Sequence, residues 1–381
     1  MNSKTLQVFA SPSRYVQGKG AIKQLGAYLA QLGSSPLLVA DDVVWGIVQE
    51  SVESSLTSAE LTVTRKSFGT FATPDSVDEL VAGINENGHD VIVGIGGGSA
   101  IDAAKAAGHL AGIRWASVPT AASSDAPTSS LAVIYSEEGE FLEYRFFERN
   151  PDLILIDTQV VANAPDHLLV SGIGDALATW VEARATARGS GSTMAGGRTT
   201  QAGTALAERS WTLLWDNAFL ALESVRSHVV TPALDKVVEA NTLLSGLGFE
   251  SGGLAAAHAI HNALTAAPQT HGLSHGQKVN FGTMTQLVLE GAPTEEIEAF
   301  VKFTTKLGLP NSLAEIGLTP ENENELRAVA EGATVEDETI HNMPFRVTAG
   351  QVIDAMKAVE GISRAVRSAN DLPAPALHVA E

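Results

Sequence analysis

Short apolar runs alternate with amphipathic or alanine-rich segments over the first part of the chain. The apolar runs, most of them bounded by turn residues, predict β-strands, and the segments between them predict helices. Strands are expected at 36–41, 61–68, 90–98, 115–120 and 152–157, with helices at 43–58, 75–87 and 99–111. A β-hairpin is expected at 131–147, with its turn around Glu138 and Gly139. This alternation predicts a mostly parallel sheet covered by helices.

The pattern changes after about residue 163, where β-branched runs almost vanish and helical periodicity takes over. Helices are expected at 165–188, 197–226, 232–248, 253–266, 279–290, 294–307, 321–332 and 350–358. The sequence therefore predicts two domains, an α/β domain at 1–162 and an all-helical domain at 163–381. The proline-rich tail DLPAPALHVAE is expected to fray.

Length and composition agree with two globular domains and exclude several classes of protein. A chain of 381 residues is too long for one ordinary core. Its net charge of −20 disfavours nucleic acid and anionic membranes as partners, and no basic cluster offsets that charge. No window is apolar enough for a transmembrane helix or a signal peptide, and the absence of cysteine excludes disulfides and thiolate zinc sites. A soluble cytoplasmic protein is expected.

Glycines end the apolar run at 90–98 and precede an alanine-rich helix, in the sequence VIVGIGGGSAIDAAK. Glycines let a backbone approach a diphosphate, and free N–H groups at a helix N-terminus bind it. The spacing is not the G-x-G-x-x-G fingerprint, and no lysine stands at the P-loop position. The cluster therefore indicates either a phosphate cradle or a tight turn that binds nothing.

Two acids, Asp41 and Asp42, end the strand expected at 36–41. In a doubly wound sheet, ligands bind at the carboxyl ends of the strands, where a carboxylate can accept both ribose hydroxyls and repel a 2′-phosphate. The usual acid lies downstream of the glycines, whereas this one lies upstream, so the fold is not a standard Rossmann unit. Asp41 is also a candidate helix N-cap.

Four of the ten histidines, His258, His261, His271 and His275, lie within eighteen residues. His258 and His261 are three apart on an expected helix and therefore share a face, and His275 opens the next helix. A metal site needs a further ligand, and Asp175 in SGIGDALATWVEA is the candidate. The alternatives are histidines satisfied by ordinary hydrogen bonds and an aspartate that caps a helix.

A series of motifs, in order along nearly the whole chain, resembles the glycerol dehydrogenases of the iron-containing, or group III, alcohol dehydrogenase superfamily. They are GGGSAIDAAK, VPTAASSDAPTSSLAVIY, SGIGDALATWVEA, GGLAAAHAIHNAL, HGLSHGQKVNFGTMTQLVLE and TIHNMPFRVT. The resemblance implies an N-terminal nucleotide-binding domain with a parallel sheet, an all-helical C-terminal domain, as in dehydroquinate synthase, and a cleft between them for NAD and a metal ion.

The resemblance also implies roles for individual residues. The metal ligands would be Asp175, His258 and His275, and Asp125 would bind the hydroxyls of a small polyol substrate. His261 and His271 would lie around the metal, with His271 a candidate for guiding a proton. The residues expected to contact NAD are Asp41, Gly96, Gly97, Gly98, Ser99, Asp102, Thr120, Ser123, Ser129, Leu131 and Tyr135.

Two departures from the family pattern bear on the metal and the substrate. Iron-dependent relatives carry histidine four positions after the first aspartate, where this chain has Thr179. Three protein ligands with an open position are the catalytic zinc pattern, although the same ligands can hold Fe²⁺. One Zn²⁺ per chain is therefore expected. The second departure is Gln277, where glycerol dehydrogenases commonly have glutamate.

The expected reaction is NAD-dependent oxidation of glycerol, or a similar vicinal diol, to dihydroxyacetone or the matching hydroxyketone. Zinc would stabilise the alkoxide that transfers hydride to the nicotinamide. Amino alcohols and hydroxyketones are alternative substrates. A dehydroquinate synthase-like lyase is disfavoured, because between Thr120 and Asp175 only Arg145 and Arg149 could bind its anionic substrate. A non-catalytic NAD-binding protein is the rival from another class. The resemblance also implies a homo-oligomer, commonly of eight chains.

Overall fold

The computed structural model describes residues 5–380. Their contacts form two compact units that interleave along the chain. The sheet unit contains Ala10–Leu169 and Asn217–Gly246. The helical unit contains the described residues up to Phe9, Val170–Asp216, and those from Leu247 onward. The domain limits expected from the sequence, 1–162 and 163–381, stay a prediction.

Six parallel strands form the sheet, in the order β1-β8-β5-β4-β2-β3. They are β1 Tyr15–Gly18, β2 Pro36–Ala40, β3 Thr64–Ser67, β4 Val91–Gly96, β5 Arg114–Pro119 and β8 Leu153–Asp157. The five strands expected from the sequence and their parallel arrangement are confirmed. Strand β1 was not expected, since YVQG is short and lacks a strongly apolar run.

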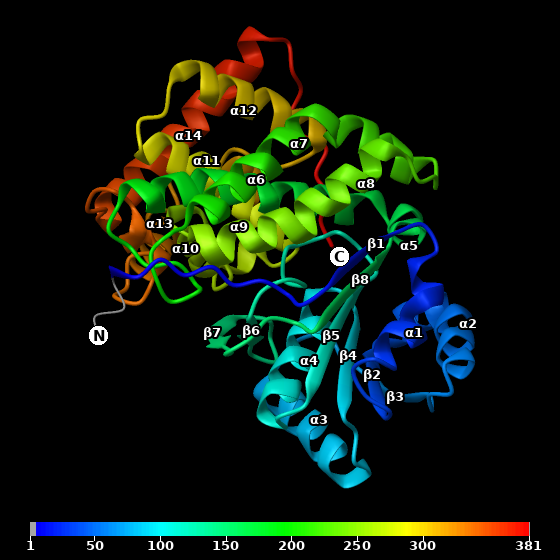
Figure 1. The fold of residues 1–381 in the computed structure, drawn as a ribbon. Helices are drawn as coiled ribbons and strands as arrows, with labels where there is room; N and C mark the ends of the chain where they lie inside the picture. Colours follow the sequence, from blue (N-terminus) through cyan, green and yellow to red (C-terminus); the bar gives the residue numbers. More distant parts are fainter. Residues whose placement is uncertain (1–4, 381) are drawn as a thin grey trace. The chain divides into compact units, whose positions relative to one another are not determined.

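Side chains of the central strands alternate between two apolar cores, one on each face of the sheet. Leu38, Val93 and Ile95 pack on one face with the helices α1 Leu25–Leu29 and α2 Asp42–Ser58. Leu37 and Ile92 pack on the other with the helices α3 Pro74–Asn87 and α4 Gly98–Leu110. Figure 1 shows these helix pairs on opposite sides of the strands. Both faces of the sheet are therefore covered, which explains why its central strands are continuously apolar.

The expected hairpin is confirmed, with β6 Leu131–Tyr135 antiparallel to β7 Phe141–Phe146. The sheet unit also contains four other whole helical elements. They are η2 Ala21–Gln24, α5 Thr158–Asn163, α8 Pro232–Glu239 and the π-helical turn η3 Ala240–Leu244. The single helix expected at 232–248 is thus divided by a π-helical turn.

The remaining helices build the helical unit or run into it from the sheet unit, and they confirm the helical character expected for the second part of the chain. They are α6 Asp166–Arg188, α7 Gln201–Arg226, α9 Ser245–Gly252, α10 Ala256–Leu264, η4 Pro268–Thr270, α11 His275–Leu289, α12 Thr294–Leu307, η5 Ala314–Ile316, α13 Glu323–Gly332, η6 Thr339–Asn342 and α14 Ala349–Ala369. Helix α14 is longer than the 350–358 expected.

The expectation that the C-terminal tail frays is wrong for its described residues. The backbone N–H of Ala380 donates to the carbonyl of Gly272 at 2.9 Å. The side-chain amide of Gln277 donates to the carbonyl of His378 at 3.0 Å. Prolines leave the tail without regular structure of its own, but its backbone groups bond to Gly272, which precedes α11, and to Gln277 in the first turn of that helix.

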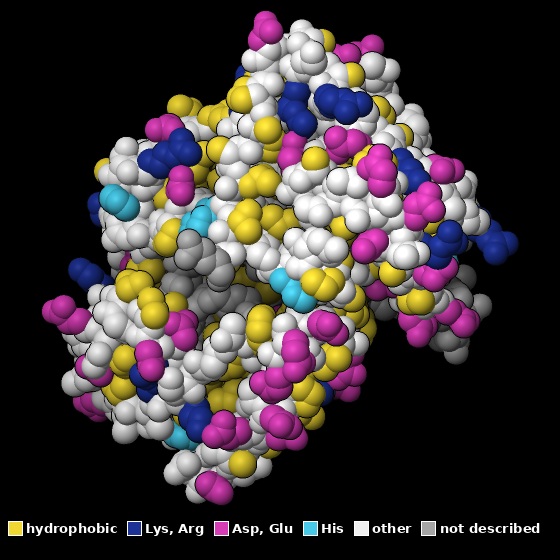
Figure 2. Space-filling view, turned by 180° about the vertical axis from the view of Figure 1, so that it is seen from behind, with side chains coloured by type: hydrophobic (Ala, Val, Ile, Leu, Met, Phe, Trp, Pro, Cys, Tyr) yellow, Lys and Arg dark blue, Asp and Glu magenta, His cyan; other side chains and the backbone are white. Residues whose placement is uncertain are grey.

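The surface reflects the excess of acidic residues. Figure 2 shows Asp and Glu side chains spread over much of the face it draws, with Lys and Arg interspersed. This agrees with the net charge of −20. Within residues 5–380, no helix combines the length and the apolar character needed to cross a lipid bilayer.

Candidate functional site

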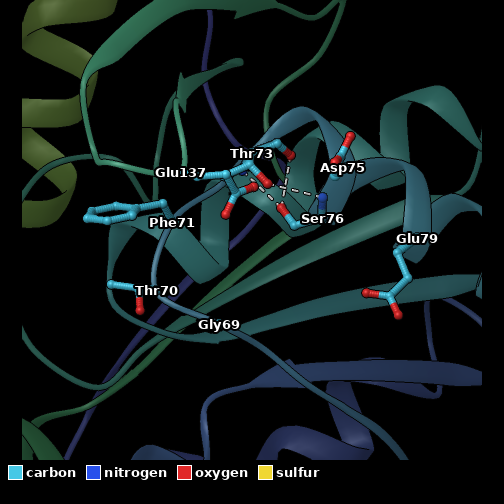
Figure 3. A pocket seen from close by; sticks show the side chains of 8 residues that line it. All are labelled: Gly69, Thr70, Phe71, Thr73, Asp75, Ser76, Glu79 and Glu137. Carbon is cyan, nitrogen blue, oxygen red and sulfur yellow. Dashed lines mark hydrogen bonds between the residues drawn. The ribbon is translucent and has the colours of Figure 1, made fainter.

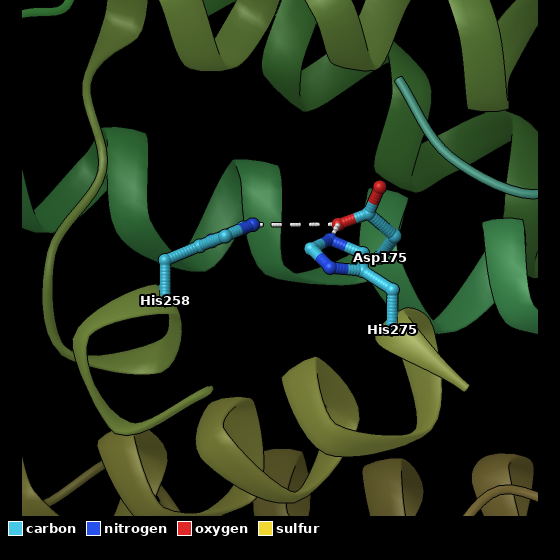
Figure 4. A group of neighbouring side chains, drawn as sticks. All are labelled: Asp175, His258 and His275. Carbon is cyan, nitrogen blue, oxygen red and sulfur yellow. Dashed lines mark hydrogen bonds and ion pairs between the residues drawn. The ribbon is translucent and has the colours of Figure 1, made fainter. Parts of the chain in front are cut away.

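Three helices of the helical unit bring Asp175, His258 and His275 together, as Figure 4 shows. The Oδ1 atom of Asp175 lies 3.1 Å from Nε2 of His275 and 3.4 Å from Nε2 of His258. One potential ligand atom from each residue lies within 4.8 Å of the other two. Two imidazoles and one carboxylate are a donor set that suits Zn²⁺ or Fe²⁺, so these residues fit a metal ion.

Close packing of α6 against α11 places His275 beside Asp175. A Cβ at Gly276 would lie 1.7 Å from the carbonyl oxygen of Ser171, and one at Gly174 would lie 2.5 Å from the carbonyl oxygen of Gly276. Only glycine therefore permits this approach at both positions. A capping box between Ser274 and Gln277 starts α11 at His275.

The charges of the cluster depend on one another. Burial alone raises the pKa of Asp175, but interactions with His275 and His258 lower it well below its usual value. Burial alone lowers the pKa of His258, but Glu182 and Asp175 raise it well above its usual value. Without a metal, the carboxylate of Asp175 and a protonated His258 thus stabilise each other. A bound cation would take over that charge and release protons.

Glu182 was not expected from the sequence, although it belongs to this cluster. Its side chain is fully buried, and its Oε2 lies 2.5 Å from Nδ1 of His258. Glu182 follows Asp175 by seven positions on α6, a spacing that puts both carboxylates on one face of the helix. That spacing is the feature of the sequence from which Glu182 could have been predicted.

The other two clustered histidines have different surroundings. His261 is buried, its ring centroid lies 4.2 Å from that of His275, and its Nδ1 lies 3.1 Å from Oδ1 of Asn262. Burial, together with the charges of His275, Lys278 and His258, lowers the pKa of His261 well below its usual value. His271 is exposed, and its Nε2 lies 3.0 Å from the carbonyl oxygen of Thr265.

In the sheet unit, Asp41 and the glycine cluster lie at the carboxyl edge of neighbouring strands. Asp41 caps α2, since its Oδ1 accepts the N–H of Val44 at 2.8 Å. Its other oxygen faces the glycines, because a Cβ at Gly96 would lie 3.9 Å from Oδ2. Asp41 is therefore an N-cap, as one hypothesis held, with a second carboxylate oxygen that points to the glycine turn.

The glycine turn opens α4 without a side-chain cap. Gly97 is the N-cap residue, and as a glycine it has no side chain to cap the first N–H groups of the helix. Gly96 has a φ of 143°, which only glycine adopts readily. Gly98 and Ser99 form the first turn and are partly exposed. The turn thus offers backbone N–H groups that an anion could accept.

Asp102, one turn further along α4, has structural contacts. It is buried, its Oδ1 lies 3.1 Å from Nζ of Lys105, and its Oδ2 accepts the N–H of Val133 at 3.1 Å. Lys105 is also buried, and it donates to the carbonyls of Ala126 and Leu131. The pair therefore fixes the loop that joins β5 to β6.

That loop carries most of the other residues predicted to bind NAD or substrate. Thr120 donates its N–H to the carbonyl of Gly96 at 3.2 Å, which ties the start of the loop to the glycine turn. Thr120 and Ser123 are partly exposed, Ser129 and Leu131 are buried, and the Tyr135 ring lies 6.0 Å from that of Phe71.

Asp125 is held by the segment around the π-helical turn. Its Oδ2 accepts a hydrogen bond from Oγ of Ser245 at 2.7 Å, and both residues are buried. Nearby, Asn241 donates to the carbonyl of Ala122 at 2.9 Å, and Thr128 donates to the carbonyl of Thr242 at 2.6 Å. π-helical turns often occur at functional sites; this one binds the loop at Ala122 and Thr128, and Ser245, which follows it, binds Asp125.

A cavity of about 500 Å³ opens where the chain leaves β3 and enters α3. Figure 3 shows its lining side chains, among them Phe71 and the capping pair Thr73 and Ser76. Asp75, Glu79 and Glu137 also line it. Three carboxylates disfavour a phosphate here, so the uncapped N-terminus of α4 is the better phosphate site.

Comparisons with known proteins assign the chain to a family. The model of the iron-containing alcohol dehydrogenase family matches residues 12–158. The chain is 49% identical over 351 residues to a glycerol dehydrogenase of Escherichia coli, covering 92% of this chain and 95% of that protein. It is 48% identical over 360 residues to a glycolaldehyde reductase of Halobacterium salinarum, covering 94% of this chain and 99% of that protein. The chain belongs to the iron-containing alcohol dehydrogenase family.

The fold comparison agrees with this membership. The solved structure of glycerol dehydrogenase from Schizosaccharomyces pombe superposes with a TM-score of 0.94 at 40% identity, covering 98% of this chain and 95% of that one. The resemblance inferred from the motifs is thereby confirmed, as is the predicted fold class. This member of the family is an alcohol dehydrogenase enzyme.

Proposed function

We propose that the enzyme oxidises glycerol, or a closely similar vicinal diol, with NAD as the hydride acceptor and one Zn²⁺ per chain. The observation that carries the proposal is the convergence of Asp175, His258 and His275 from three helices. The 49% identity to a glycerol dehydrogenase supports the substrate class. When bound, the zinc ion would lower the pKa of the substrate hydroxyl, and the nicotinamide would accept hydride from its carbon.

The proposed choice of zinc over iron rests on α6. Thr179 stands one turn after Asp175. Its methyl group packs against Gly248, where a Cβ would lie 2.7 Å from that methyl carbon. With threonine at this position, three protein ligands remain, and an open position suits a substrate oxygen. Elemental analysis of the purified enzyme distinguishes zinc from iron.

The chain's own residues would bind cofactor and substrate as follows. The uncapped N–H groups at Gly98 and Ser99 would bind the diphosphate of NAD, and Oδ2 of Asp41 would accept the ribose hydroxyls. Asp125, oriented by Ser245, would accept a hydrogen bond from a polyol hydroxyl. The remaining NAD contacts predicted from the sequence are part of this proposal. They are Gly96, Gly97, Asp102, Thr120, Ser123, Ser129, Leu131 and Tyr135.

Reduction of a small hydroxyaldehyde is the second candidate, because identity to the glycolaldehyde reductase is nearly as high, at 48%. An initial-rate panel of glycerol, other vicinal diols, dihydroxyacetone and glycolaldehyde, each with the NAD and NADP couples, tests both. Preference for glycerol with NAD supports the proposal, and activity with glycolaldehyde alone overturns it. His271 as a proton-guiding residue, a cytoplasmic location and a homo-oligomer of eight chains belong to the same proposal, and light scattering on the purified enzyme tests the last.

A further inference from the structure

The first turn of α10, which carries His258, lacks a local cap. Its N-cap residue is Ala255, whose side chain cannot accept a hydrogen bond. Buried N–H groups at a helix start need acceptors, since each one left unpaired costs about 1–3 kcal/mol. Side chains from two neighbouring helices supply these acceptors.

Glu182 of α6 and Gln286 of α11 each accept two of the four backbone N–H groups of residues 255–258. Oε1 of Glu182 accepts the N–H of Ala255 at 2.8 Å and that of His258 at 3.0 Å. Oε1 of Gln286 accepts the N–H of Ala256 at 2.9 Å and that of Ala257 at 3.0 Å. Both side chains are fully buried. Each side chain therefore caps two N–H groups of α10 with a single oxygen atom.

The second polar atom of each side chain distinguishes them. Nε2 of Gln286 donates to the carbonyl of Val181 at 3.1 Å, a contact that requires an amide. Oε2 of Glu182 lies 2.5 Å from Nδ1 of His258, a contact in which the carboxylate accepts the ring N–H. When a metal ion binds, this contact would keep the proton on Nδ1, so that Nε2, on the side of Asp175, could offer its lone pair to the ion.

We propose that Glu182 is a positioning residue, which holds His258 in the Nδ1–H tautomer with Nε2 directed at the metal site while also capping α10. This inference rests on the proposed function, in which Asp175, His258 and His275 hold the metal. An amide at 182 could keep the cap through its oxygen, but its NH₂ group would face Nδ1. His258 would then have to accept there and carry its proton on Nε2, which blocks coordination.

Two variants separate the two roles of Glu182. Glu182→Gln keeps an oxygen that can cap α10 but removes the acceptor for Nδ1–H of His258. Gln286→Ala removes the acceptor for the N–H groups of Ala256 and Ala257 and leaves the contact between Glu182 and His258 intact. Full-length metal-free protein of each variant is titrated with Co²⁺, and the visible absorption of the bound ion reports affinity. Thermal unfolding of the same metal-free samples reports the cap.

Glu182→Gln should weaken Co²⁺ binding by about 10–100-fold, as loss of a ligand's supporting partner typically does. Gln286→Ala should lower the metal-free Tm and change the affinity for Co²⁺ by less than about threefold. Glu182→Asp, which keeps the carboxylate on a shorter side chain, should recover part of the affinity. Wild-type affinity in Glu182→Gln, or equal loss in Glu182→Asp and Glu182→Gln, would overturn the inference.

A separate control tests the proposed function on which this inference rests. His258→Ala should abolish Co²⁺ binding. If His258→Ala binds Co²⁺ as tightly as the wild type, the metal site itself is wrong. If His258→Ala fails to bind and Glu182→Gln binds normally, only the role of Glu182 is wrong.

Discussion

The side-chain amide of Gln277 joins the C-terminal tail to the start of α11, donating to the carbonyl of His378 at 3.0 Å while its Oε1 accepts the N–H of Ser274 at 2.8 Å. Glutamate, which is common at this position in the glycerol dehydrogenases, could make the second bond but has no hydrogen to donate to the tail. The glutamine thus couples the tail to the turn that precedes His275.

Gln277→Glu should therefore loosen the tail and leave the cap of α11 intact. We expect faster amide hydrogen exchange in residues 372–380 and little change in the first turn of α11. Ser274→Ala is the matched control, since it removes the hydroxyl that accepts the N–H of Gln277 and leaves the amide that reaches the tail. Unchanged exchange in the tail of Gln277→Glu would show that the contact does not hold it.

Charge and capping at Asp41 can be separated by substitution. Asp41→Asn keeps an acceptor for the N–H of Val44 but removes the negative charge, so the preference for NAD over NADP should narrow without loss of stability. Asp41→Ala should also narrow the preference for NAD over NADP, and it should lower the free energy of unfolding by about 1 kcal/mol because it removes the cap of α2. Kinetics with both cofactors and urea unfolding check these outcomes. A wild-type enzyme that uses NADP as readily as NAD would contradict the role of Asp41.

Substitution of Asp125 should weaken substrate binding more than the binding of the cofactor or the metal. Asp125→Asn should raise KM for glycerol while NADH affinity and zinc content stay near wild type. Ser245→Ala removes the hydrogen bond that orients Asp125, worth about 1 kcal/mol, so kcat/KM should fall about fivefold. Equal damage to substrate, cofactor and metal binding by Asp125→Asn would indicate a structural role.

The four clustered histidines should differ in their effect on metal content. His258→Ala or His275→Ala should lose most of the metal and nearly all activity, because each removes a ligand. His261→Ala and His271→Ala should keep stoichiometric metal, with losses in affinity or activity of at most about 10–100-fold. Elemental analysis of the four variants measures their metal content and tests this ranking. Metal lost from His261→Ala but retained in His258→Ala would show that the wrong member of this pair was assigned.

Lys278 should make stability depend on pH in the alkaline range. Burial lowers its pKa from 10.5 to about 8, so below pH 8 the folded state bears the cost of a buried charge. Between pH 8 and 10.5 the unfolded chain binds a proton that the folded chain has lost, so this contribution to stability rises with pH.

Lys278→Met should therefore raise the free energy of unfolding of the metal-free protein at pH 7, by at most about 3 kcal/mol. Its advantage over the wild type should shrink as pH rises from 8 to 10.5. Urea unfolding of both proteins across this range measures the difference. Lys306→Met, at an exposed position of α12, controls for the substitution itself. A constant difference across the range would contradict the assignment to Lys278.

The sequence alone determined those features whose cause lies in neighbouring residues. Apolar runs bounded by turn residues predicted five of the six strands of the sheet, and the Glu138–Gly139 turn predicted the hairpin. The glycine cluster predicted a tight turn from strand to helix, because conformational freedom is a property of the glycines themselves. Motifs in series led to the family, and with it to Asp175, His258 and His275.

The tertiary structure decided every feature that depends on which distant residues meet. Strand β1 exists because its backbone finds β8 as a partner, which its own composition does not indicate. The tail is ordered by Gln277 and Gly272, and Asp125 is oriented by Ser245. Glu182 is 76 residues from His258 in sequence, and only the packing of α6 on α10 brings the two side chains together. Hydrogen bonds act over about 3 Å, so contacts between separate helices follow from packing, and local pattern does not reveal them.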